Sequence, residues 1–277
     1  MINNAKVIDD TIHNGKRITS LQLVMPRFIL AQFNTHRVFS RSTASSRAIP
    51  TAKLIEQVRN DYVRPVQWGM NKAGMQSERE LDVHEQELAK ELWWRAANSA
   101  ADFAEQLDKL ELHKQYANRI LEPFMLAHTI VTATEWDNFF ALRLDDAAQP
   151  EIKLLAQAMK EVITNSIPNE SQYHLPYILE EEIFAYQKSL GLTSDNVLQN
   201  AFEHFAPISA ARCARVSYLN HDQSNPNFEK DMALASRLFE HKHYSPFEHQ
   251  AMSAMDNEQH LTRNFVGWAQ YRAMIGG

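Results

Sequence analysis

A repeat of apolar residues at intervals of three and four dominates the segment 81–110. The apolar residues fall at positions 88, 92, 96, 100, 103, 107 and 110, which is the period of an amphipathic α-helix of many turns. Shorter helices are predicted over 147–163, 177–189, 195–205 and 228–240, each bounded by Pro, Gly, Asn or Ser. The chain must therefore fold around packed helices.

One segment instead has the pattern of a β-strand. Ile18, Leu21, Leu23 and Met25 partly alternate with polar residues, Pro26 interrupts the run, and a second apolar run covers 28–30. This pattern predicts a strand followed by a break. Polar stretches at 69–74 and 221–227 are typical of loops. Together these segments predict an α+β fold in which a small sheet is backed by long helices.

The composition is that of a globular protein, with 277 residues, a net charge of −6, 44% hydrophobic residues and one cysteine. Cys213 cannot form an internal disulfide, and its alanine neighbours favour a buried helical thiol over a nucleophile. No apolar run approaches the roughly 18 residues of a membrane span, and residues 1–6 lack the apolar core of a signal peptide. We therefore expect a cytoplasmic protein without a membrane partner.

The charge is distributed unevenly along the chain. Residues 16–65 carry nine Lys or Arg but only Glu56 and Asp61 as acids, a local net charge of +7 against −13 for the rest. A surface for a nucleic acid polymer would be basic over a whole face. The compact basic block favours a site for a small anion, with a solvated surface strip as the alternative.

Several common cofactor motifs are absent from the sequence. The chain has seven glycines and no Gly-x-Gly-x-x-Gly, which excludes a Rossmann fingerprint. Gly69 and Gly74 have P-loop spacing, but Met75 and Gln76 follow where Lys and Ser or Thr are needed. No Gly-x-Ser-x-Gly or His-Glu-x-x-His segment occurs. Side chains, rather than a glycine loop, must hold any cofactor.

The densest cluster of basic and hydroxyl side chains lies at 36–47. It begins with His36, contains Arg37, Arg41 and Arg47 among several Ser and Thr residues, and includes no acid. Guanidinium groups match two phosphate oxygens at once, and hydroxyls or a helix start can supply further donors. The segment predicts an anion or phosphate site, and a solvated turn is the alternative.

Two further segments carry polar side chains whose pattern alone is less specific. In 134–143, Asn138 and Arg143 lie on neighbouring faces of a predicted helix, although an exposed arginine explains the pattern equally well. The segment 241–249 contains three histidines and Glu248. It fits either a metal site or a loop, bent at Pro246, that presents polar side chains. Its spacing matches no helical zinc pattern, and no metal is predicted.

Four segments together resemble the flavin-dependent thymidylate synthases. That family carries Arg-His-Arg, seven residues, Ser, and an Arg two places later, and Thr35-His36-Arg37, Ser45 and Arg47 stand here at the same spacing. The other matches are Pro26 to Phe33, the segment from Glu135 to Arg143 with Ala148-Gln149-Pro150-Glu151-Ile152, and the pair Ala214-Arg215-Val216-Ser217 and Ser245-Pro246-Phe247-Glu248-His249.

The sequence departs from the family pattern in two ways. The last pair of segments normally precedes the Arg-His-Arg motif but here closes the chain, which predicts a circular permutation. In addition, Thr35 replaces the first Arg of the motif, Thr43 stands where an acid is usual, and Ala48 where Tyr is common. These three substitutions leave open how the folate takes part in the reaction and which base the nucleotide carries.

The resemblance implies one catalytic domain over 1–277 with a helical insertion at about 77–113, and a small, mostly antiparallel sheet. It also implies a homotetramer with FAD between subunits, NADPH as reductant and methylenetetrahydrofolate as carbon donor, acting on dUMP or a related pyrimidine deoxynucleotide. Arg143 and His36 would be catalytic. The flavin contacts would be His36, Arg37, Asn138, Ser217, His243, Ser245 and Glu248, and the nucleotide contacts Gln32, Thr43, Ser45, Ser46, Arg47, Arg119 and Arg143.

The activity implied by the resemblance is transfer of a one-carbon unit to C5 of dUMP with reduced FAD. Because no thiolate adds to the ring, Arg143 would stabilise the negative charge that develops on the pyrimidine. The altered Thr35 and Thr43 motivate one alternative, a flavin-dependent hydroxymethylase of dUMP or dCMP. A flavin- or nucleotide-binding protein without turnover and a metal-dependent hydrolase are the other classes considered.

Overall fold

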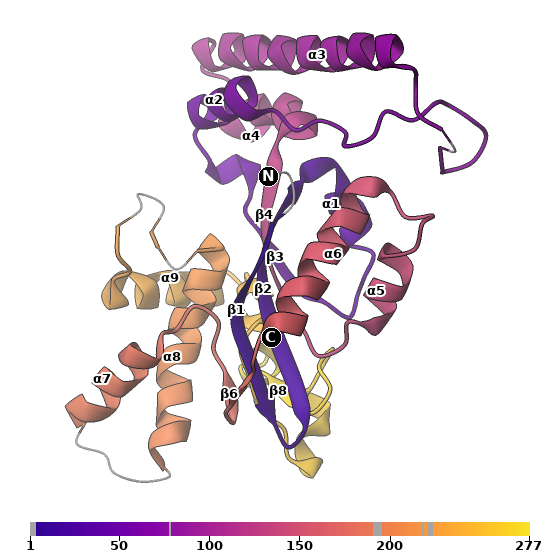
Figure 1. Cartoon of the computed structure of the whole chain (residues 1–277). Coiled ribbons are helices and arrows are strands. Elements are labelled where there is room, and N and C mark those ends of the chain that lie inside the picture. The colour runs from indigo at the N-terminus through magenta and orange to yellow at the C-terminus, as the bar shows by residue number, and fades with distance from the viewer. Residues whose placement is uncertain (1–3, 78, 191–195, 218, 221–223) are drawn as a thin grey trace.

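A twisted five-stranded sheet occupies the middle of the computed structural model, which describes residues 4–77, 79–190, 196–217, 219–220 and 224–277 (Figure 1). The strand order is β3-β4-β2-β1-β5, and only the β1–β5 pair is parallel. The strands are β1 (Asn4–His13), β2 (Lys16–Pro26), β3 (Ser40–Thr43), β4 (Leu126–Ala133) and β5 (Asn169–Glu170). The predicted α+β class with a mostly antiparallel sheet is confirmed.

The hairpin of β1 and β2 forms the core of this sheet. Asn14 and Gly15 connect the strands with φ values of 49° and 72°, the left-handed backbone that a two-residue hairpin turn requires. The predicted strand is confirmed as β2, which ends at Pro26. The apolar run after Pro26 is helical rather than extended, as a 3-10 turn (Arg27–Ile29) and the helix α1 (Leu30–Phe33).

One face of the sheet packs against helix α6 (Pro150–Asn165) (Figure 1). Leu21 and Leu23 of β2 are fully buried against Leu155 and Met159 of α6. Alternate residues of a strand point to opposite faces, so this packing fixes the register of β2. Fully burying one such side chain contributes roughly 2 kcal/mol.

The C-terminal third of the chain packs on the other face and adds a second, three-stranded antiparallel sheet. Its strands are β6 (Tyr173–His174), β7 (Ala251–Ser253) and β8 (Trp268–Gln270), and its helices are α7 (Glu180–Leu190), α8 (Asn196–Arg215), α9 (Phe228–Glu240) and α10 (Tyr271–Met274), with 3-10 turns at Ser245–Glu248 and Asp256–Leu261. The predicted helices 147–163, 177–189, 195–205 and 228–240 correspond to α6, α7, α8 and α9.

Buried hydroxyl and imidazole groups tie this C-terminal third to the central sheet. Thr132 of β4 bonds to Nδ1 of His249 at 2.9 Å, and Nε2 of His249 bonds to Ser42 of β3 at 3.0 Å. Ser20 of β2 bonds to Nε2 of His174 at 2.7 Å. Burial lowers the pKa of His249 to about 3, so this imidazole is a neutral crosslink at pH 7.

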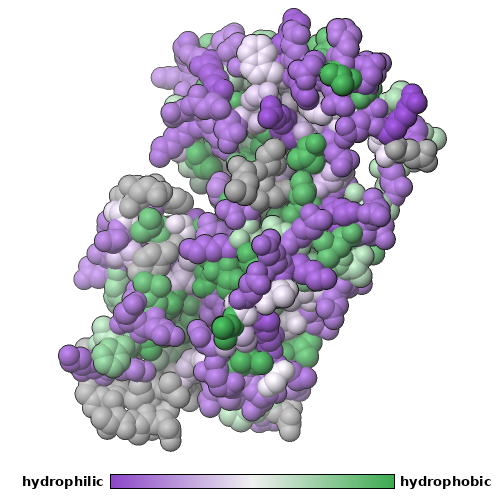
Figure 2. All heavy atoms as spheres, in the orientation of Figure 1, coloured by the Kyte–Doolittle hydropathy of each residue, from purple (hydrophilic) through white to green (hydrophobic). Residues whose placement is uncertain are grey.

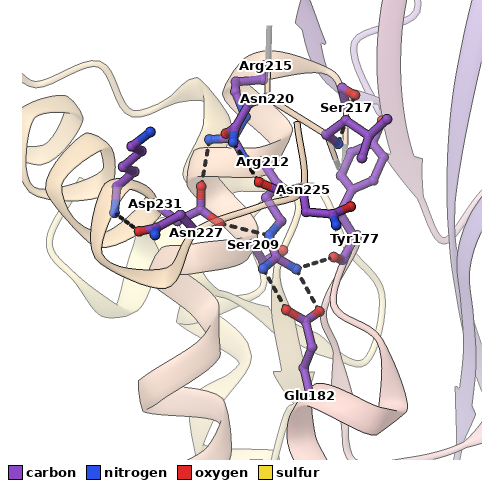
Figure 3. A network of polar contacts seen from close by, with 12 residues as sticks. Tyr177, Glu182, Ser209, Arg212, Arg215, Ser217, Asn220, Asn225, Asn227 and Asp231 are labelled. Atoms are coloured by element: carbon purple, nitrogen blue, oxygen red, sulfur yellow. Dashed lines mark hydrogen bonds and ion pairs between the residues drawn. The ribbon is translucent and has the colours of Figure 1, made fainter. Parts of the chain in front are cut away.

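An ion-pair network joins α8 to α7 and α9 (Figure 3). Arg212 lies between two acids, donating to Glu182 at 2.7 Å and to Asp231 at 3.0 Å, and Arg215 donates to the same Asp231 at 2.7 Å. Burial opposes the charge of Arg212, but its bonds to Glu182 and Asp231 raise its pKa. Arg215, the arginine of the Ala-Arg-Val-Ser segment, therefore joins α8 to α9 through Asp231.

The long predicted helix is confirmed as α3 (Val83–Lys109). Asp82 caps it, accepting from the Glu85 N–H at 2.9 Å while Glu85 reaches back to the Asp82 N–H at 3.2 Å, a reciprocal pair that satisfies two free donors. With α2 (Thr51–Asp61), α4 (Lys114–Ala117) and the 3-10 segment Asn118–Phe124, α3 forms a unit at the end of the sheet where β4 begins (Figure 1).

The buried face of α3 differs from the one that the periodicity predicts. Ala97, Ala101 and Ala104 pack against α2 and are fully buried, whereas Leu92 and Phe103 are 54% and 60% exposed. Small residues let the two helices approach closely, so the alanines, and not the larger residues, form the contact.

The face of the molecule drawn in Figure 2 is mainly hydrophilic, with hydrophobic residues in small groups.

The cysteine and the hydrophobicity of the helices were also predicted from the sequence. Cys213 is buried in α8, as its alanine neighbours predict. Within the part of the chain that the structure describes, no helix has the length and hydrophobicity needed to cross a membrane.

Candidate active site

The loop between α1 and β3 is held by a cluster of aromatic rings. Phe33 and Phe39 pack against Phe139 of the helix α5 (Asp137–Arg143), with centroid distances of 5.8 and 5.3 Å. The His36 ring stands edge to face on Phe139 at 4.8 Å. The chain turns after α1, where the Thr35 N–H donates to the Gln32 carbonyl at 3.2 Å and the His36 N–H to the Phe33 carbonyl at 3.3 Å, and this turn carries His36 onto α5.

Arg143 and His36 form the central polar contact of this region. Nε of Arg143 donates to Nε2 of His36 at 2.9 Å, and Nη2 lies 3.4 Å from the hydroxyl of Thr35. Burial, followed by the charges of Arg143 and Arg41, lowers the pKa of His36 to about 4. The imidazole is therefore neutral at pH 7 and accepts the bond at Nε2, which leaves its proton on Nδ1.

A cleft of about 910 Å³ opens beside this pair. Trp136 and Phe140 line it and stack at 6.3 Å with an interplanar angle of 23°. The charged and amide side chains in its wall are Arg17, Arg37, Glu135, Asp137, Asn138, Arg143 and Lys160. Stacked aromatic surface beside cationic groups suits a flat, anionic organic ligand.

A second group of predicted residues meets at Glu122. Ser46 donates to the Glu122 carboxylate at 2.7 Å, Arg119 at 2.8 Å, and Arg27 lies 3.0 Å from it. Burial opposes ionisation, but the bond from Ser46 and the charges of Arg27 and Arg119 lower the pKa of Glu122. Glu122 therefore fixes two residues that were predicted to bind the nucleotide.

Four further predicted nucleotide contacts are Thr43, Ser45, Arg47 and Gln32. Thr43 bonds to Thr129 of β4 at 2.9 Å, and Ser45 and Arg47 are exposed. Oε1 of Gln32 is buried and has no hydrogen-bond partner within the described parts of the chain. A buried acceptor without a donor costs free energy, so Gln32 is a group that a bound ligand could satisfy.

The C-terminal motif residues are more dispersed. Glu248 pairs with Arg272 and lines a separate cavity together with Arg37. Ser217 accepts from the Leu219 N–H at 3.1 Å, in the turn after α8 (Figure 3), and His243 and Ser245 are exposed. Neither the cleft nor this cavity is lined by Ser217, His243 or Ser245.

A strained backbone position precedes Ser217. Val216 has a φ of 54°, a left-handed conformation that a β-branched residue rarely adopts. Such strain is concentrated at functional sites and is retained where the surrounding structure enforces it.

The three histidines of 241–249 do not form one site. His241 and His243 are exposed, with ring centroids 6.3 Å apart, whereas His249 is buried between Thr132 and Ser42. Among the residues with described positions, no group of three or more His, Cys, Asp or Glu side chains is arranged to hold a metal ion.

The sequence did not single out several residues that the structure brings to these sites. Glu122 meets Ser46 and Arg27 only through tertiary contacts. Arg41, which the sequence placed in the basic segment without a role of its own, donates at 2.8 Å to the His36 carbonyl and so supports the loop. Arg41 in the segment 36–47 and Glu122, the acid after Arg119, were the available signals. For Arg263 and Arg272, which line the cavity of Glu248, the sequence held none.

Comparisons with known proteins place this arrangement in a family. A family model described as thymidylate synthase complementing protein matches residues 18–169. Among solved structures, the chain is similar to a UMP/dUMP methylase, PolB from Streptomyces cacaoi bound with 5-Br UMP, at 13% identity and a TM-score of 0.45, over 73% of this chain and 94% of that chain. No curated protein matches. The family match spans β2, the His36 loop, β4, α5 and most of the cleft.

Proposed function

Since the chain belongs to the thymidylate synthase complementing protein family, we propose that it transfers a one-carbon unit from methylenetetrahydrofolate to C5 of dUMP, using FAD that NADPH reduces. The pairing of Arg143 with neutral His36 at the wall of the cleft is the observation that carries this proposal. The chemistry needs a fixed cation beside the pyrimidine, and this pairing supplies one.

The residues of the cleft fit FAD and a nucleotide. Arg37 and Arg143 face a cleft that also holds Asn138 and the stacked rings of Trp136 and Phe140. Outside the lining of this cleft, Oε1 of Gln32 is buried without a partner among the described residues. Arg37 and Asn138 of the cleft would hold the cofactor, together with Ser217, His243, Ser245 and Glu248, which lie outside the cleft lining. When bound, FAD supplies the reducing equivalents of the reaction.

Arg143 stabilises the negative charge that the pyrimidine ring acquires when C5 becomes nucleophilic. Burial lowers the pKa of Arg143, yet a guanidinium stays protonated at pH 7. In a site that excludes water, such a fixed charge is worth several kcal/mol in the transition state. His36, by accepting from Nε, holds the guanidinium in one orientation before the substrate binds.

The nucleotide phosphate and sugar bind near the Glu122 cluster. Ser45 and Arg47 are exposed there, and Glu122 orients Ser46 and Arg119. A charge-assisted bond between Arg47 and phosphate is worth roughly 1.5 to 3 kcal/mol. The thiol of Cys213 takes no part, because its burial raises its pKa and leaves it uncharged and inaccessible.

A homotetramer with active sites between subunits completes the proposal, in the cytoplasm, where a single cysteine stays reduced. Leu88, Leu92 and Phe103 are exposed along α3, and Leu110 is exposed directly after it. Phe103 and Leu110 line an apolar groove of about 580 Å³. Exposed apolar rows of this kind are typical of subunit contacts. We also propose that the order of the motifs is circularly permuted, which is consistent with the packing of His249 on Ser42.

The mass of the product tests this function. Purified protein is incubated with FAD, NADPH, methylenetetrahydrofolate and either dUMP or dCMP, and the nucleotide is weighed by mass spectrometry. A methyl group on dUMP supports the proposal, and a hydroxymethyl group on dUMP or dCMP replaces it by the sibling chemistry. A yellow protein that leaves both nucleotides unmodified would contradict both enzymatic functions.

A further inference from the structure

A continuous chain of hydrogen-bonded side chains joins the two sheets in the interior of the protein. It begins at β1 and ends at β3, and successive polar atoms along it lie 2.5 to 3.3 Å apart. Its members, in order, are Asp9, Thr11, His174, Ser20, Thr132, His249 and Ser42. Every member after Asp9 is buried, so these groups must satisfy one another.

The carboxylate of Asp9 gives the chain its direction, because an ionised carboxylate only accepts hydrogen bonds. Its Oδ2 accepts from the Leu175 N–H at 2.7 Å and lies 3.2 Å from Nδ1 of His174. Burial lowers the pKa of His174, although Asp9 and Asp10 oppose this effect, so the ring is neutral at pH 7 and carries one proton. That proton lies on Nδ1, since a bare Nδ1 would turn its lone pair toward the carboxylate. Nδ1 then also donates to Thr11 at 2.9 Å, and Thr11 donates to Oδ1 of Asp9 at 3.3 Å.

The single proton of each hydroxyl fixes the remaining hydrogen bonds. Nε2 of His174 has no proton, so Ser20 donates to it at 2.7 Å. Ser20 then has no proton left for Thr132, and Thr132 must donate to Ser20 at 2.5 Å. For the same reason Nδ1 of His249 donates to Thr132 at 2.9 Å. The neutral ring of His249 therefore accepts at Nε2 from Ser42 at 3.0 Å. Every hydrogen bond of the chain points toward the carboxylate.

The far end of this chain lies between two segments that the proposed function uses. Ser42 directly precedes Thr43, a proposed nucleotide contact, and His249 directly follows Glu248, a proposed flavin contact. β3 has only four residues and lies at the edge of its sheet, paired with β4 alone among the described strands. The placement of β3 against the turn Ser245–Glu248 therefore depends on side-chain contacts such as the bond between Ser42 and His249.

We propose that Asp9 and His249 are positioning residues, and that the carboxylate of Asp9 orients the His249 ring through this chain so that Ser42 holds β3 against the turn. The proposal deepens the proposed function, on which its effect on nucleotide binding rests. With the opposite direction Ser42 would accept from His249, and its own buried proton would need an acceptor that no other side-chain hydrogen bond in the described part of the chain supplies. An unsatisfied buried hydroxyl costs free energy, so the observed direction is the one that holds β3 best.

Nitrogen-15 NMR of the full chain with labelled histidine tests this direction at pH 7 without flavin or nucleotide. Spectra of His174→Gln and His249→Gln identify the two signals. In the wild type we expect both rings to be neutral and protonated on Nδ1. Asp9→Ala should shift His249 toward the form protonated on Nε2, although His249 makes no hydrogen bond to Asp9, and a purely local role of Asp9 would not move this signal. Asp61→Ala, an exposed aspartate of α2, is the matched control and should leave both signals unchanged.

A break in the middle of the chain gives a second test. Thr132→Val keeps the shape of the side chain but removes the hydroxyl, so His174 should stay protonated on Nδ1 while His249 changes. The wild-type spectrum decides the direction by itself, whether or not either variant folds. A wild-type ring protonated on Nε2, or an unchanged His249 signal in folded Asp9→Ala and folded Thr132→Val, would overturn the proposal.

Titration with dUMP then measures the positioning effect. Asp9→Ala and Thr132→Val should each raise the dissociation constant and the KM of dUMP about fivefold, with a smaller change in kcat, because neither His36 nor Arg143 belongs to the chain. An unchanged dissociation constant in a variant whose His249 signal has moved would refute the positioning role. Wild-type protein with the expected ring protons but no affinity for dUMP would refute the proposed function alone, whereas a working enzyme with the opposite ring protons would refute this inference alone.

Discussion

Arg143 of α5 donates to His36, a residue 107 positions earlier in the chain, at 2.9 Å. The contact joins the two segments that carry the densest polar motifs of the sequence. Because the pKa of His36 is lowered to about 4, the imidazole accepts from the guanidinium without competing with it for positive charge. The pair therefore presents one oriented cation to the cleft.

Removal of this cation should abolish product formation while leaving the cofactor in place. For Arg143→Ala we expect a loss of kcat of about a thousandfold, because the charge acts on the transition state. The visible absorbance of bound flavin should persist, since other residues are proposed to hold FAD. Arg95→Ala, an exposed arginine of α3, is the control. Wild-type turnover in Arg143→Ala would show that the assigned role is wrong.

Arg47 should instead act on nucleotide affinity. Because it is exposed beside Ser46, Arg47→Ala should raise the dissociation constant of dUMP about tenfold or more and change flavin binding little. Arg119→Ala provides a comparison, because Arg119 already pairs with Glu122 at 2.8 Å and should matter less. Equilibrium titrations with dUMP and FAD measure both effects, and an equal loss of FAD in Arg47→Ala would contradict this division.

Stability should fall in weak acid because the folded protein keeps histidines neutral. The pKa values of His36 and His249 are lowered to about 4 and about 3, against about 6.5 in the unfolded chain. As the pH falls from 6.5 to 4.5, these histidines bind protons in the unfolded state but stay neutral in the folded state. The free energy of unfolding therefore decreases. The pKa of Glu122 is lowered in the folded protein, so the stability that this carboxylate contributes is lost only below about pH 4.5.

Urea unfolding at pH 7 and pH 5 measures this effect. In His36→Gln, the difference in unfolding free energy between the two pH values should shrink by about 1 to 2 kcal/mol relative to the wild type, after allowance for partial solvent screening. His13→Gln, on the hairpin and partly exposed, is the control. An unchanged difference in His36→Gln would mean that His36 is protonated in the folded protein.

Strong local signals predicted part of the fold correctly. Pro26 marks the end of β2, and the three-four repeat marks α3. The sequence pattern missed β1 and β4. β1 carries Asp9 and Asp10, whose partners are the Leu175 N–H at 2.7 Å and Arg17 at 2.8 Å. β4 is covered on both faces, so its residues lack alternation.

The residues of the candidate site also fall into those that the sequence predicted and those that it could not. His36 and Arg143 could be found because each lies in a motif of its own, although nothing in the sequence indicates that they touch. The Glu122 cluster and the cavity lined by Glu248 depend on segments far apart in the chain that come together, such as those of Arg41 and Arg272. Local periodicity contains no information on such contacts. For the same reason it selected the wrong buried face of α3.

The exposed row on α3 yields a prediction about assembly. Phe103 is 60% exposed and lines the apolar groove with Leu107 and Ile120, so Phe103→Asp should leave the fold of one chain intact but place a charge in a subunit contact. Analytical ultracentrifugation should show a tetramer for the wild type and smaller species for the variant, with activity falling in parallel if sites lie between subunits. Asn98→Asp, on another face of α3, should remain tetrameric. A Phe103→Asp protein that stays tetrameric would show that this row faces solvent in the assembly.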